Sequence, residues 1–162
     1  MNVNAVTFDT PVIAPEMAIE DPWIDEHGQL GNAGYTLLFD RIAEHAFGIL
    51  SCGAHYRAQT GRAMLVAQAG LTHLRELRKA DHVRGTFRLI DADDSRIQAY
   101  MELYHVEGWL SATCERVYHH ADLATMQPVP FGEELASDLA TMQRYHRALP
   151  PTKYMGRPVS LK

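Results

Sequence analysis

The stretch Trp23-Ile-Asp-Glu-His-Gly-Gln-Leu-Gly-Asn-Ala-Gly-Tyr-Thr-Leu-Leu-Phe-Asp40 changes character halfway, from a polar, glycine-rich loop to an amphipathic segment. Apolar residues then recur at intervals of three and four, which predicts a helix from about residue 32 to residue 50. This stripe consists of Tyr35, Leu38, Phe39, Ile42, Ala43, Ala46, Phe47 and Leu50. A helix with one such apolar face has to be covered, so we expect the rest of the chain to supply a sheet.

The second half of the chain predicts an antiparallel sheet. Beyond residue 81, apolar and polar residues alternate with a period of two, which is typical of strands. The alternation covers residues 82–89 and 97–104, and a tight turn at Glu107-Gly108 leads to a third predicted strand at about residues 109–120. Long strands joined by short turns favour an antiparallel meander.

The segment at residues 62–74, just before this meander, is almost continuously apolar between Ala63 and Leu71. A run of this kind predicts a central strand that is covered on both faces. Gly70 within it suggests a bulge or a close approach of another backbone.

Both ends of the chain carry weaker signals. Pro11 interrupts a short extended segment at residues 6–13, which predicts an edge strand or the end of a strand. Residues 133–149 have the apolar and charge pattern of a helix, which Pro150-Pro151 stops. The tail at residues 152–162 is expected to be loosely ordered.

Together these elements predict one α+β domain over residues 1–162, in which an antiparallel sheet wraps around one long central helix. The core is expected at about residues 5–131, with a C-terminal helix and tail at 132–162. The other face of the sheet must be solvated or buried against a second copy of the chain. The exposed face and the sheet edges therefore favour a homo-oligomer.

The composition restricts the classes of function. A chain of 162 residues with 46% apolar and 22% charged residues is typical of one soluble globular domain. A net charge of −5 argues against nucleic-acid binding, and no apolar run approaches the length of a membrane span. The N-terminus shows no signal peptide. Cys52 and Cys114 are too few for a disulfide framework, so a cytoplasmic protein with reduced thiols is expected.

The opening stretch also carries a family resemblance. Asp25, Gly28 and Tyr35 keep the spacing of a loop aspartate, a glycine three residues on and a tyrosine seven further on, ahead of a long helix. With residues 37–40 and 74–81, they make most of the chain similar to the hotdog-fold acyl-CoA thioesterases of the 4-hydroxybenzoyl-CoA type. The resemblance implies the hotdog fold and an acyl-CoA ester as the small-molecule substrate.

Within this family, residues 23–25 and 124–131 most resemble the betainyl-CoA thioesterases. From the residues alone, a lone aspartate in a loop is usually a turn or capping residue. The resemblance implies instead that Asp25 is the base or nucleophile and that the backbone N–H of Asn32 is the oxyanion donor. It also implies active sites between the subunits of a homodimer, or of a homotetramer. No metal and no bound cofactor are expected, because coenzyme A is part of the substrate.

The chain departs from the family pattern at two polar positions. Gln29 replaces a histidine that many relatives carry after the loop aspartate. Gln68 and Gly70 stand where the betainyl-type relatives often carry an acidic residue and a histidine. Both glutamines are candidates for substrate contact. The alternatives are a solvated loop residue for Gln29 and a hydrogen-bonded polar core residue for Gln68.

Three further residues are candidates for substrate binding. Tyr35 is one, although it also fits a core position. Arg75 and Arg78 lie in the densest basic cluster of the chain, and a guanidinium group suits the phosphates of coenzyme A. A solvated turn with balanced charges would show the same pattern. Asn32 is in addition a favoured residue for capping a helix, a role that is compatible with a backbone donor.

Two alternatives to hydrolysis stay open. The changed Gln29 and Gln68 positions would also fit a non-catalytic acyl-CoA-binding protein. A hotdog hydratase acting on an enoyl-CoA is the other alternative. That chemistry usually needs an Asp–His pair, and the sequence places no histidine at the expected helix start.

Overall fold

The computed structural model describes residues 6–161. Residues 1–5 lie outside the described residues. The predictions about the start of the domain and about a signal peptide depend partly on them. The α-helices are α1 (Asn32–Ile49), α2 (Ala54–Thr60) and α3 (Glu133–His146). A 3-10 turn covers Asp21–Trp23, and the strands are β1 (Val12–Ile13), β2 (Met17–Ala18), β3 (Arg62–His73), β4 (His82–Ala92), β5 (Arg96–His105) and β6 (Leu110–Asp122).

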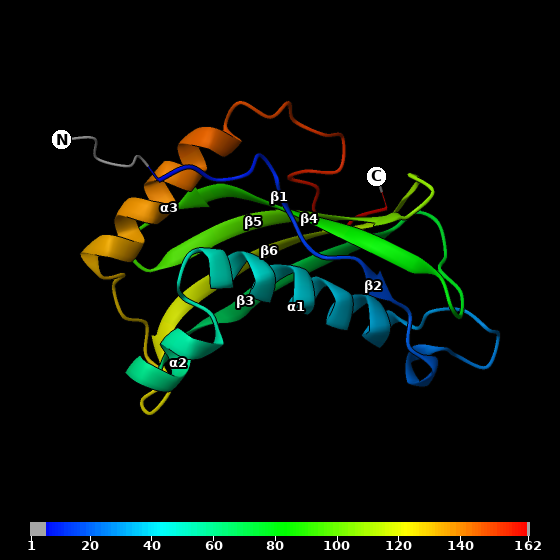
Figure 1. The fold of residues 1–162 in the computed structure, drawn as a ribbon, viewed down its shortest axis with the longest axis horizontal. Helices are drawn as coiled ribbons and strands as arrows, with labels where there is room; N and C mark the ends of the chain where they lie inside the picture. Colours follow the sequence, from blue (N-terminus) through cyan, green and yellow to red (C-terminus); the bar gives the residue numbers. More distant parts are fainter. Residues whose placement is uncertain (1–5, 162) are drawn as a thin grey trace.

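The strands form one antiparallel sheet in the order β1-β4-β5-β6-β3, and β2 also pairs with β4. Figure 1 shows α1 lying across one face of this sheet, with the loop before α1 at one end of the helix and α2 near the other. The predicted meander and the α+β architecture are confirmed. Among residues 6–161, no helix is both long enough and apolar enough to cross a membrane.

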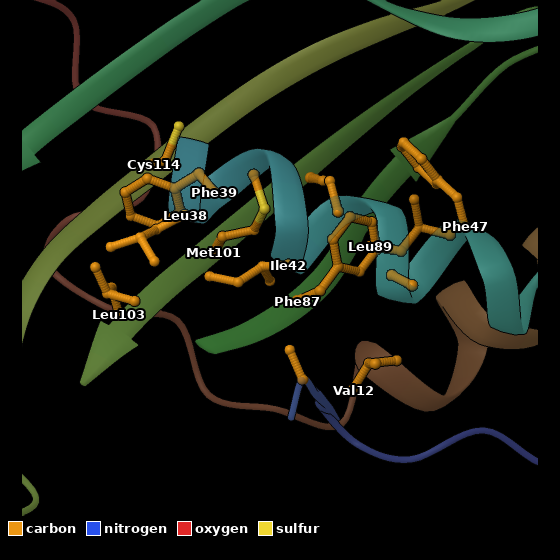
Figure 2. Close-up of a cluster of buried hydrophobic side chains, with 14 of the residues drawn as sticks. Val12, Leu38, Phe39, Ile42, Phe47, Phe87, Leu89, Met101, Leu103 and Cys114 are labelled. Atoms are coloured by element: carbon orange, nitrogen blue, oxygen red, sulfur yellow. The ribbon is translucent and has the colours of Figure 1, made fainter. Parts of the chain in front are cut away.

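The apolar stripe that begins in α1 is buried along its whole length, as predicted. It packs against inward-facing residues of the sheet, including Phe87 and Leu89 of β4, Met101 of β5 and Cys114 of β6 (Figure 2). Removal of this apolar surface from water is the main force that holds the helix across the sheet.

Gly85 of β4 marks a close approach between the sheet and α1. A Cβ atom at this position would lie 2.1 Å from Cδ1 of Ile42. We therefore expect Gly85→Ala to lower the free energy of unfolding by about 1–3 kcal/mol, because the added methyl group overpacks a well-packed core. Urea unfolding measures this change.

Gly48→Ala is the matched control, because a Cβ atom at Gly48 would meet nothing within 4 Å. Alanine also has the higher helix propensity, so this variant should be neutral or more stable. An equal loss of stability in both variants would show that the contact between Gly85 and Ile42 is not the cause.

β3 contradicts the prediction of a central strand at residues 62–74. Among the described strands it pairs with β6 alone and forms one edge of the sheet. Val66, Ala67, Gln68 and Ala69 are exposed there. A central strand and an apolar edge strand both produce a long apolar run, so the sequence pattern did not distinguish them.

The C-terminal helix is confirmed, and α3 packs along β4. The tail after it is more ordered than expected. Thr152 Oγ1 donates to the hydroxyl of Tyr100 at 3.0 Å, and the N–H of Gly156 donates to Oε2 of Glu115 at 2.7 Å. Tyr100 and Glu115 alternate with residues that face the core, so the tail covers part of the outer face of the sheet.

Candidate active site

The loop ahead of α1 is a tight hairpin. Ile24 pairs antiparallel with Leu30 at its base. The N–H of Asp25 donates to the carbonyl of Gln29 at 2.7 Å, and the N–H of Gly28 donates to the carbonyl of Asp25 at 3.1 Å. Gly28 has a φ of 76°, a left-handed conformation that suits glycine. The hairpin thus returns Asp25 to a position opposite Gln29, just ahead of α1.

The side chain of Asp25 is exposed and is engaged by its own loop. Its Oδ1 accepts hydrogen bonds from the N–H of Gln29 at 3.0 Å and from the N–H of His27 at 2.8 Å. These bonds, first of all that from Gln29, hold the pKa of Asp25 below its ordinary value. The group is therefore a carboxylate at neutral pH. Within residues 6–161, Oδ2 has no hydrogen-bond partner and remains available to a ligand.

The start of α1 presents backbone donors. Gly31 is the N-cap and Asn32 is the first helical residue, so the capping role considered for Asn32 is wrong. The N–H groups of Gly34 and Tyr35 donate to the carbonyl of Gly31 at 2.9 and 3.3 Å. The N–H groups of Asn32 and Ala33 precede them, where a helix has donors without intrahelical partners and the positive end of its dipole.

Gly34 allows the hairpin to pack directly on the first turn of α1. A Cβ atom at Gly34 would lie 2.2 Å from Cδ1 of Leu30 and 3.0 Å from Cβ of Trp23. The N–H of Gly31 also donates to the carbonyl of Trp23 at 3.0 Å. These contacts fix the hairpin, and Asp25 with it, against the helix start. No sequence pattern indicated this role of Gly34.

The connection between β3 and β4 forms a wall beside the hairpin. Tyr35 is buried, and its hydroxyl accepts a hydrogen bond from the N–H of Leu77 at 3.1 Å. The N–H of Leu30 donates to the carbonyl of Leu77 at 2.8 Å, and Gln29 pairs antiparallel with Arg78. The structure therefore brings Gln29, Tyr35 and Arg78 together around the start of α1, with Tyr35 bracing the wall from the core.

Arg75 and Gln68 lie farther from the hairpin. The guanidinium group of Arg75 stacks 4.0 Å above the ring of Trp109, which holds it beside the β5–β6 turn. Gln68 is exposed on β3, five residues or about 17 Å of extended strand before His73. Its exposure contradicts the alternative of a polar core residue.

His73 lies at the helix start, where no histidine was predicted. Its Nε2 lies 3.2 Å from Oδ1 of Asn32, and its ring stands edge-on to the ring of Tyr35 with centroids 4.6 Å apart. That expectation is therefore wrong. His73 and Asn32 are 41 residues apart, so only the folded chain brings them together.

A buried arginine, also missed, ties α1 to β6. Arg116 is 2% exposed, and its Nη1 donates to Oδ1 of Asp40 at 2.5 Å. The same guanidinium group donates to the hydroxyl of Tyr118 at 3.3 Å and to the carbonyl of Thr36 at 3.4 Å. Because arginine stays charged, its burial requires such partners. They fix the first half of α1, and hence the helix start, on the sheet.

Other chemistry finds less support in the described part of the chain. Burial raises the pKa of Cys52 to about 12 and also raises the pKa of Cys114, so neither thiol is an activated nucleophile. Between residues 6 and 161, no three His, Cys, Asp or Glu side chains gather as metal ligands would. Two surface hollows of about 350 and 490 Å³ adjoin Asp93 and Asp94, and none of the predicted site residues lines them.

Comparisons with known proteins identify the family of the chain. The thioesterase-like superfamily matches residues 20–139. A betainyl-CoA thioesterase of Pseudomonas aeruginosa is 26% identical over 162 residues, which cover 99% of this chain and 98% of that protein. An L-carnitine dehydrogenase/betainyl-CoA thioesterase of Ruegeria pomeroyi is 22% identical over 139 residues, which are 86% of this chain and 28% of that longer protein.

The fold has a counterpart among solved structures. A hypothetical protein of Staphylococcus aureus, in complex with CoA, superimposes with a TM-score of 0.85 at 16% identity. The match covers 97% of this chain and 99% of the other. The hotdog fold expected from the sequence is confirmed.

Proposed function

We propose that Asp25 and the start of α1 carry out the hydrolysis of the thioester. The chain belongs to the thioesterase-like superfamily and is an acyl-CoA thioester hydrolase of the hotdog fold. One observation carries this proposal. The hairpin holds Asp25 opposite Gln29, just ahead of the end of α1 at which the N–H groups of Asn32 and Ala33 precede the first intrahelical bond.

The proposed mechanism uses the two parts of this site together. The N–H of Asn32 and the helix dipole stabilise the negative charge that develops on the thioester oxygen. The carboxylate of Asp25 either accepts a proton from the attacking water or attacks the carbonyl carbon itself. In the first route water adds to the carbonyl carbon, the C–S bond breaks, and coenzyme A leaves as the thiolate while the acyl group becomes a carboxylic acid. In the second route the carboxylate displaces the coenzyme A thiolate and forms a mixed anhydride with the acyl group. A water molecule then hydrolyses this anhydride, which releases the carboxylic acid and regenerates Asp25. The lowered pKa of Asp25 favours the ionised form that either route needs.

Coenzyme A is proposed to bind along the wall beside the hairpin. Arg78 flanks Gln29, and Arg75 is held in place by Trp109. A guanidinium group can bind a phosphate with two parallel hydrogen bonds, so both arginines suit the phosphates of coenzyme A. Gln29 is then the hairpin residue placed to contact the substrate near the thioester.

We propose a small acyl group, with betainyl-CoA as the first candidate, because two relatives are betainyl-CoA thioesterases. The proposed reaction uses no metal and no bound cofactor, since Asp25 and α1 supply the activation and the oxyanion site. A cytoplasmic location stays a prediction from the sequence.

We further propose that the active unit is a homodimer joined through β3. This strand presents an exposed edge of backbone N–H and C=O groups, and its residue Val66 is 48% exposed. An apolar edge of this kind favours pairing with another strand. Pairing with a second β3 would bring Gln68, which is distant from the helix start of its own chain, toward a substrate bound at the other subunit.

Release of free thiol from a panel of acyl-CoA esters tests the function. We expect hydrolysis of betainyl-CoA or another short ester with a kcat/KM of about 10⁴–10⁸ M⁻¹s⁻¹. Benzoyl-CoA and palmitoyl-CoA provide the comparison of acyl size. Tight binding of the esters without thiol release would instead support a non-catalytic acyl-CoA-binding protein.

One observation favours the hydratase alternative. His73 lies at the helix start and could supply the histidine of the Asp–His pair that a hydratase usually needs. Crotonyl-CoA in the same panel separates the two reactions. A thioesterase releases thiol from it, whereas a hydratase removes the double bond and leaves the thioester intact.

A further inference from the structure

His73 joins the end of β3 to the first residue of α1. Its backbone is fixed by pairing with Ala112 of β6, and its ring rests edge-on against buried Tyr35. Its Nε2 lies 3.2 Å from Oδ1 of Asn32. The imidazole is thus held by the sheet and by the core, although it is exposed to solvent.

The carboxamide of Asn32 contacts His73 through Oδ1, whereas Nδ2 has no hydrogen-bond partner among the described residues. Among the described residues, the contact of the Asn32 carboxamide is with Nε2 of His73, so His73 orients this group. Oxygen and nitrogen lie on opposite sides of the planar amide, so binding Oδ1 to the imidazole turns Nδ2 away from it. Among the described residues no hydrogen bond uses Asn32 Nδ2, which leaves this donor to a ligand.

We infer that the side-chain amide of Asn32 is a further donor to the thioester oxygen and that His73 is the positioning residue that orients it. This inference rests on the proposed function, because it places the ester at the start of α1. A side-chain amide beside a backbone N–H is an established arrangement for stabilising an oxyanion. This side-chain donor can be removed by Asn32→Ala while the backbone N–H stays in place.

The contact does not require His73 to transfer a proton. An imidazole donates from Nε2 to a carbonyl oxygen in its neutral Nε2–H form and in its protonated form alike. Loss of His73 should therefore lower kcat without changing the shape of the pH profile. An acid–base role would change that profile.

Single variants separate the donor from the residue that positions it. Asn32→Ala keeps the backbone N–H, and we expect it to lower kcat by about 10²-fold with little change in KM. His73→Phe keeps a ring against Tyr35 but loses the hydrogen bond, and a misplaced donor should lower kcat by about 10-fold or more. His73→Gln can still donate to Asn32 and should restore most of the activity. His55→Phe, on exposed α2, is the control and should behave as wild type.

The double variant Asn32→Ala/His73→Phe decides whether His73 acts through Asn32. We expect it to be no slower than Asn32→Ala alone, because no amide remains to be oriented. The inference is overturned if the losses of kcat in the two single variants multiply in the double variant. It is also overturned if His73→Phe or Asn32→Ala keeps full activity, or if His73→Gln does not restore activity. Circular dichroism establishes that the compared variants are folded.

The wild-type protein separates this inference from the function on which it rests. If it hydrolyses an ester and only the His73 and Asn32 results fail, the proposed function stands and the inference falls. If it hydrolyses no ester of the panel, both fall together.

Discussion

Replacing Asp25 by asparagine is expected to lower kcat by about 10²–10⁴-fold, the range of an acid–base group. Asparagine has nearly the same size, and its Oδ1 can still accept the hydrogen bonds from the N–H groups of Gln29 and His27. The hairpin should therefore keep its shape, while the side chain can neither accept a proton from water nor attack the carbonyl carbon. Steady-state thiol release should show this loss in kcat with KM nearly unchanged.

Glu26→Gln is the matched control, because it removes the same charge from a neighbouring exposed position of the loop. It should turn over the ester at close to the wild-type rate. If Asp25→Asn and Glu26→Gln are equally active, Asp25 has no part in the chemistry.

The pH profile of the wild-type enzyme gives a second readout of Asp25. Because hydrogen bonds from Gln29 and His27 lower its pKa, the active carboxylate prevails at all pH values above that lowered pKa. Activity that depends on it is lost only as the pH falls through this value, below the ordinary aspartate pKa of about 3.9. The profile of Asp25→Asn should lack that limb.

Ala67→Pro is expected to abolish both the homodimer and most of the activity. Ala67 lies at the bulge of β3, where the register with β6 shifts between Val66 and Gln68, so a proline there should disturb the sheet of its own chain little. A second β3 could not pair past it. If the site needs both subunits, kcat/KM should fall by about 10²-fold or more. Light scattering should then report a monomer.

Ala67→Thr controls for the position, because threonine keeps the backbone N–H and suits a strand. It should remain dimeric and active. A folded Ala67→Pro monomer with full activity would show that one chain contains the complete site.

Local periodicity was sufficient to predict the scaffold of the site. The stripe from Tyr35 to Leu50 is buried, and the alternation after residue 81 became β4, β5 and β6. Both signals depend on which face of an element is apolar, and that is set within a few residues of sequence. The turn at Gly28 is equally local, because a left-handed backbone there suits glycine.

Features that depend on contacts distant in sequence could not be predicted. β3 has the apolar run of a central strand, but among the described strands it pairs with β6 alone. His73 reaches Asn32 across 41 residues, and Arg116 reaches Asp40 across 76. The alternation of a strand predicts which residues are polar, but it does not predict which distant side chain a polar residue contacts. The contacts around the helix start therefore became visible only in the folded chain.

A crystal structure of the Asp25→Asn variant with an uncleaved acyl-CoA ester would show where the ester binds. We expect the thioester oxygen about 3 Å from the backbone nitrogen of Asn32, with position 25 beside the carbonyl carbon. An ester whose carbonyl lies away from the start of α1, for example in the hollows beside Asp93 and Asp94, would contradict it.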